Sequence, residues 1–65
     1  MFRYEIGAHI LVKRQGYLEH DPIEVKIIAR APNMIKARII SDGWFKVGEI
    51  RWLTDSNWFS VGRVR

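Results

Sequence analysis

Five cations and one tryptophan between positions 26 and 46 are spaced as an anion-binding surface would require. Basic residues alternate with apolar ones along this stretch, so in extended chain they share one side. Cations on one side of a sheet can contact successive phosphates, and a flat indole can stack on a base or lie against a sugar. The pattern predicts a non-enzymatic nucleic-acid-binding surface, dominated by phosphate contacts and formed by Lys26, Arg30, Lys36, Arg38, Trp44 and Lys46.

The distribution of charge also indicates an anionic partner. The 65-residue chain has 11 Lys and Arg against 7 Asp and Glu, a formal net charge of +4. The two signs balance over residues 1–22, so residues 23–65 account for the whole excess. An excess gathered on particular strands favours a partner such as nucleic acid.

Two other kinds of partner fit parts of the same sequence. The exposed apolar residues beside the cations (Ile28, Met34, Ile40 and Trp44) could instead form a homodimer interface with the charges at its rim. Three aromatic residues, Tyr17, Trp52 and Trp58, could form a peptide groove or a cage for a cationic side chain, with Asp55 or Glu49 as the acid. The competing interpretation is core filling, which we expect for Trp52 and Phe59.

Catalytic and metal-binding patterns are not found in the sequence. His9 and His20 are the only histidines, there is no cysteine, and Asp21 beside His20 is the one carboxylate considered as a co-ligand. A metal site would need more ligands than this. No serine lies in a Gly-x-Ser-x-Gly elbow, and no glycine-rich loop is present to hold a phosphate. We therefore expect no enzyme activity, no metal and no cofactor.

Period-two alternation of apolar residues predicts an all-β chain. The expected strands, in order, are 8–14, 23–31, 35–40, 44–50 and 58–64, with a short 3₁₀ turn within 51–57. One face of these strands should be a core made of Ile10, Val12, Val25, Ile27, Ala29, Ile35, Ala37, Ile39, Phe45, Val47, Phe59 and Val61.

The turns set the expected register. A two-residue loop at Pro32-Asn33 would pair odd positions with even ones and place charged side chains in the core, so we expect a three-residue loop, either 31–33 or 32–34. A three-residue loop over Ser41-Asp42-Gly43 would set Ile39 against Phe45 inside and Ile40 against Trp44 outside.

In length and in the order of these features, the chain resembles the SH3-like barrels, and most closely integrase C-terminal and Tudor-like barrels. The first strand, the long loop 15–22 and the turn at Ile50-Arg51-Trp52-Leu53 carry the resemblance. It implies one five-stranded SH3-like barrel over residues 1–65. The integrase-like layout favours double-stranded DNA over RNA, whereas a stacking Trp44 would suit single strands equally well.

Composition sets the expected cellular setting. A chain without cysteine fits a reducing cytoplasm. No apolar run reaches the roughly 18 residues of a membrane span, and residues 1–16 lack the apolar segment of a secretory signal. A soluble cytoplasmic protein without a membrane partner is the expectation.

Overall fold

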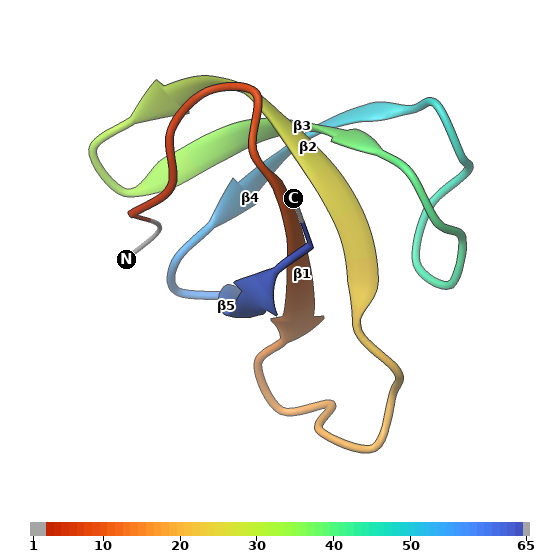
Figure 1. Ribbon diagram of the computed structural model, residues 1–65. Coiled ribbons are helices and arrows are strands. Elements are labelled where there is room, and N and C mark those ends of the chain that lie inside the picture. The colour runs from red at the N-terminus through yellow and green to blue at the C-terminus, as the bar shows by residue number, and fades with distance from the viewer. Residues whose placement is uncertain (1–2, 65) are drawn as a thin grey trace.

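The computed structural model describes residues 3–64, which form five antiparallel strands (Figure 1). The strands are β1 (His9–Arg14), β2 (Ile23–Ala31), β3 (Met34–Ile39), β4 (Ile50–Thr54) and β5 (Trp58–Arg63). The prediction of an all-β fold with five strands is confirmed. Residues 3–64 contain no helix, and hence none long and apolar enough to cross a membrane.

The five strands form one strongly curled sheet. Their order is β4-β3-β2-β1-β5, so β4 and β5 lie at opposite edges although only residues 55–57 separate them in sequence. Across a flat sheet these edges would be about 19 Å apart, at roughly 4.8 Å per strand. Three connecting residues span at most about 14 Å between Thr54 and Trp58. The sheet must therefore bend its edges toward each other (Figure 1), but no β4–β5 pairing closes it.

The hairpin between β2 and β3 has a two-residue loop, although a three-residue loop was expected. Ala31 pairs with Met34, which leaves Pro32 and Asn33 as the loop. A bulge at Ile28 makes this loop compatible with the core, because Ile27 pairs with Ala37 and the next pair is Ala29 with Lys36. The extra residue on β2 keeps the apolar side chains of both strands on the core face, where a two-residue loop alone would have set apolar residues opposite charged ones.

The fourth strand is shifted along the chain from its predicted position. It was expected at 44–50, with a 3₁₀ turn after it, but β4 is Ile50–Thr54 and a non-helical turn follows at 55–57. Residues 40–49 instead form a loop, so the predicted pairing of Ile39 with Phe45 is wrong. This loop is held to β3 by hydrogen bonds from the Gly48 amide to the Ile39 carbonyl and from the Ile39 amide to the Glu49 carbonyl.

The core lies on the concave face of the curled sheet. Seven of the predicted core residues are fully buried, namely Ile10, Val12, Val25, Ile27, Ile35, Ala37 and Ile39. Four further residues complete the buried cluster: Ala8, Ile23, Leu53 and Trp58. Leu53, which was not among the predicted core residues, is buried because the shifted β4 sets it opposite Ile35.

Five predicted core residues lie elsewhere, and displaced registers explain them. Val47 is 62% exposed because it belongs to the 40–49 loop, and Val61 is 51% exposed at a bulge in β5. Ala29 is half-buried because the Ile28 bulge turns it to the outer face opposite Lys36. Phe45 and Phe59 are half-buried, and Phe45 packs against the edge of the core.

Gly43 provides a test of the 40–49 loop. Its φ of +135° is a region that side-chain-bearing residues rarely adopt, and a Cβ there would lie 3.2 Å from Ile23 Cγ2. We expect Gly43→Ala to destabilise the fold by about 1–3 kcal/mol. Gly62→Ala is the matched control, because Gly62 has no such φ and an added Cβ meets no atom within 4 Å. Equal melting temperatures of the two variants would contradict this loop conformation.

Candidate nucleic-acid interface

A row of side chains crosses four strands on the outer face of the sheet. Lys26 of β2 pairs with His9 of β1 on one side and with Arg38 of β3 on the other. Arg38 in turn pairs with Ile50 of β4. Paired residues point to the same side of a sheet, and their neighbours Val25 and Ile39 face the core. Lys26 and Arg38 therefore lie side by side on the outer surface.

A second row runs next to the first and contains a cation and an aromatic ring. Lys36 of β3 pairs with Ala29 on one side and Trp52 on the other. The Lys36 Nζ atom lies 5.9 Å from the centroid of the Trp52 ring. Trp52 is 50% exposed and Ile50 is 45% exposed, so both present apolar surface beside the cations. We call Lys26, Lys36, Arg38, Ile50 and Trp52 the outer face patch.

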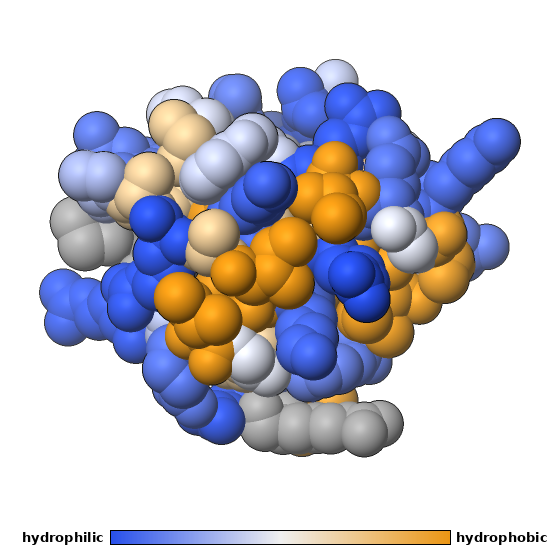
Figure 2. Space-filling model, turned by 90° about the horizontal axis from the view of Figure 1, so that it is seen from above, coloured by the Kyte–Doolittle hydropathy of each residue, from blue (hydrophilic) through white to orange (hydrophobic). Residues whose placement is uncertain are grey.

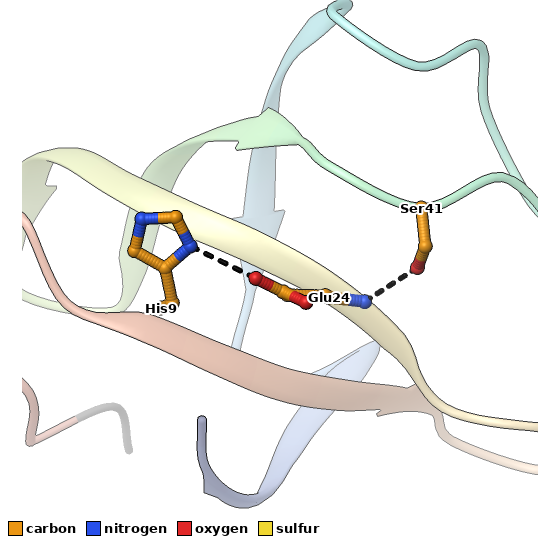
Figure 3. A network of polar contacts seen from close by, with 3 residues as sticks. All are labelled: His9, Glu24 and Ser41. Carbon is orange, nitrogen blue, oxygen red and sulfur yellow. Dashed lines mark hydrogen bonds and ion pairs between the residues drawn. The ribbon is translucent and has the colours of Figure 1, made fainter. Parts of the chain in front are cut away.

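The cations of the outer face patch have no acidic partner. Within residues 3–64, no carboxylate forms an ion pair with Lys26, Lys36 or Arg38. The nearby carboxylate of Glu24 is held instead by His9, with 2.9 Å between Glu24 Oε2 and His9 Nδ1, and the Glu24 amide donates to Ser41 Oγ (Figure 3). The patch thus keeps an excess of positive charge.

Three residues of the predicted surface are placed elsewhere. Arg30 follows the Ile28 bulge and pairs with Ile35, which turns it from the outer face to an exposed position at the end of the hairpin. Lys46 and Trp44 belong to the 40–49 loop rather than to a strand. Of the predicted surface, the sheet brings together Lys26, Lys36 and Arg38, and it adds Trp52 in place of Trp44.

Trp44 belongs to an aromatic cluster between the loops 15–22 and 40–49. Its ring centroid lies 5.2 Å from Tyr17, 4.7 Å from His20 and 5.8 Å from Trp58. Phe45 extends the cluster, at 5.7 Å from Trp58. Edge-to-face and tilted contacts at these distances are favourable between aromatic rings. We call these five residues the aromatic cluster.

The aromatic cluster already contains a cation of the chain itself. The Arg14 Cζ atom lies between 5.5 and 5.8 Å from three ring centroids, those of Tyr17, Trp44 and Trp58. This arrangement differs from the predicted groove, because Trp52 lies on the outer face and Trp58 is buried, with 4% exposure. One of the two acids predicted for the cage is also engaged elsewhere, since Glu49 is ion-paired with Arg51. A cationic ligand would have to displace Arg14.

Arg14 was not singled out from the sequence, although a signal for it exists. It continues the alternation of Ile10 and Val12, which places it on the core side at the last residue of β1. Its cross-strand partner there is Trp58. A cation on the apolar face at the end of a strand indicates that residues outside the strand contact it. Here these are aromatic residues of the loops 15–22 and 40–49.

Residues 3–64 contain no group of three or more His, Asp and Glu side chains placed to hold a metal ion. His20 lies against Trp44 in the aromatic cluster. Comparisons with protein-family models, with curated proteins and with solved structures found no match for this chain.

Proposed function

We propose that this protein is a non-enzymatic nucleic-acid-binding module that uses the outer face patch. The observation that carries the proposal is the direct pairing of Lys26 with Arg38, next to the Lys36–Trp52 pair. Like charges directly opposite each other destabilise a sheet. A polyanion lying across the three strands would remove this repulsion, and the nearby indole would meet a base or a sugar.

The proposed contacts are mainly with phosphates, with weak sequence preference. The patch offers ammonium and guanidinium groups and an indole, but no Asn or Gln to read adenine and no acidic side chain to read cytosine. DNA is the favoured partner, because of the resemblance to integrase C-terminal barrels. The absence of cysteine supports a reducing, cytoplasmic setting for this activity.

We also propose that the curled sheet is an SH3-like barrel. An SH3-like barrel is supported by the five strands, the long loop after β1, and the bend that brings β4 and β5 toward each other. In such an arrangement the outer face of β2, β3 and β4 is a continuous convex surface, which suits contact with a polymer.

A protein-binding function is the second candidate. Tyr17 of the aromatic cluster (49% exposed) and its sequence neighbour Leu18 (65% exposed) leave apolar surface there. A homodimer is the other form of this alternative. The residues predicted for it, Ile28, Met34, Ile40 and Trp44, are half-buried, so the exposed Ile50 and Trp52 are the side chains that we propose for it. Figure 2 shows that the hydrophobic side chains of the upper surface form a band broken by hydrophilic ones.

A titration with labelled oligonucleotides tests the proposed function. Single-stranded and double-stranded oligonucleotides of equal length would be titrated at two salt concentrations, with fluorescence anisotropy as the readout. We expect binding at low salt that weakens as salt increases, by roughly 0.9 in log–log slope per duplex phosphate contacted. No binding of either strand form at low salt would contradict the proposal, since electrostatic contacts are strongest there.

Trp52→Ala distinguishes stacking from phosphate contact. If the exposed indole stacks on a base, we expect the variant to lose about 1–3 kcal/mol of single-strand affinity. Duplex affinity should change less, because its bases are already stacked. Trp52 is half-exposed, so the variant should remain folded. Equal losses for both strand forms would assign Trp52 to sugar or phosphate contact, and dimer dissociation in sedimentation would support the homodimer.

A further inference from the structure

We propose that Arg14 and the aromatic cluster form a second site, which binds a nucleotide unit. The phosphate would lie on the guanidinium of Arg14, and the base would lie against the exposed rings of Tyr17 and His20. This site is separate from the outer face patch, because Arg14 alternates with Ile10 and Val12 on the opposite side of the sheet.

Aromatic rings hold the guanidinium of Arg14 in place. Three of them surround its Cζ atom within 6 Å, the range in which a cation is attracted to the ring face. Trp58 is buried and forms the floor, while β1 fixes the backbone of Arg14 opposite that residue. A side chain so oriented loses little further freedom when it binds a ligand.

The hydrogen-bond donors of this guanidinium are not used within the described chain. Across residues 3–64, the Arg14 side chain forms no ion pair and no hydrogen bond. Within the same range, no buried side-chain nitrogen lacks a partner, so the unused N–H groups of the half-buried Arg14 reach solvent. Arginine presents these donors as a planar fork that matches the oxygens of a phosphate.

The rings around Arg14 favour an anion that carries a planar group. Tyr17 is 49% exposed, His20 is also exposed, and their centroids are 5.9 Å apart. Both rings therefore offer surface on which a base can stack. The positive charge already present repels a second cation. A nucleotide joins an oxyanion to a flat ring within one unit, which is the combination that these groups recognise.

Nuclear magnetic resonance titration with small probes tests this site. The Arg14 Nε–H and the Trp44 indole N–H would be followed while adenosine 5′-monophosphate, adenosine, inorganic phosphate or acetyl-Tyr-Glu-amide is added. We expect the nucleotide to bind at least about tenfold more tightly than adenosine or phosphate alone, as joining two weak ligands does. Equal affinities for all of these ligands, or tighter binding of the acidic dipeptide, would overturn the proposal.

Variants separate this site from the outer face patch. Arg14→Gln should reduce nucleotide affinity at least about tenfold, because it removes a charge-assisted bidentate contact. Arg14→Lys keeps a cation near the rings but removes the planar, bidentate guanidinium, so it should also weaken nucleotide binding. This variant replaces Arg14→Gln in the experiment if Arg14→Gln does not fold. Lys26→Gln is the control, and it should leave nucleotide binding unchanged while weakening duplex binding. Unchanged nucleotide affinity in a folded Arg14 variant would overturn the site without affecting the proposed function.

Discussion

Reversing the charges of Lys36 and Arg38 together should abolish nucleic-acid binding while the protein stays folded. Both side chains lie on the outer face, and their β3 neighbours Ile35, Ala37 and Ile39 fill the core. Two carboxylates would repel a polyanion where two cations had attracted it. We expect duplex affinity to fall by roughly 100-fold or more, about 2.8 kcal/mol at 1.4 kcal/mol per tenfold. Any residual binding should show a salt slope lower by about 1 for each phosphate contact removed.

The matched control uses the other two cations of the predicted surface. Arg30→Glu with Lys46→Glu changes the net charge by the same amount, but the structure places these residues off the outer face. If the position of the cations, rather than the net charge, determines binding, this double variant should keep most of the affinity for nucleic acid. Equal losses in both double variants would show that net charge, rather than the outer face patch, attracts the nucleic acid.

Arg38→Glu alone should separate binding from stability. It would place a carboxylate directly opposite Lys26, where the protein now has two like charges. Opposite charges at such a cross-strand pair contribute about 0.2–1 kcal/mol. We therefore expect its melting temperature to stay level or rise while nucleic-acid affinity falls. A lower affinity together with an unchanged or higher melting temperature would indicate that the Lys26–Arg38 pair favours binding and reduces the stability of the fold.

Shortening a central core side chain should have the largest effect on stability. Ile27 and Ile39 are both 0% exposed and lie on the central strands β2 and β3. We expect Ile27→Ala or Ile39→Ala to cost about 2–4 kcal/mol through lost burial and the cavity left behind. For a domain of this size, 1 kcal/mol corresponds to a melting shift of roughly 4–8 °C. Thermal unfolding followed by circular dichroism would measure it.

Val47→Ala and Val61→Ala are the controls for that measurement. The alternation of the sequence predicts both residues in the core, but both are more than half exposed. We expect each substitution to change stability by no more than about 0.5 kcal/mol. A loss for Val47→Ala as large as that of Ile27→Ala would contradict the position of β4, and such a loss for Val61→Ala would contradict the bulge in β5.

The alternation of the sequence was sufficient for β1, β3 and the first part of β2, but not for β4 and β5. Apart from Arg14 at the end of β1 and the residues that follow the Ile28 bulge in β2, the core positions of β1, β2 and β3 are apolar and the outer positions are mostly polar, so the faces can be read from the local pattern. Residues 44–50 also contain alternating apolar side chains, yet Leu53 rather than Val47 fills the core. The local pattern does not distinguish them, because the choice depends on which residue reaches Ile35 across the sheet.

The residues of the outer face patch likewise fall into those that the sequence predicts and those that only the tertiary structure brings together. The sequence by itself determined that Lys26, Lys36 and Arg38 share a side, because period two within a strand assigns each residue to a face. Only the tertiary structure decided which tryptophan joins them, because Trp52 meets Lys36 through pairing of β3 with the shifted β4. The Ile28 bulge, which turns Arg30 away, and the contact of Arg14 with rings from two loops likewise depend on register and loop closure. Lys36 with Trp52 and Arg14 with Trp44 are contacts between residues far apart in sequence, so no local pattern encodes them.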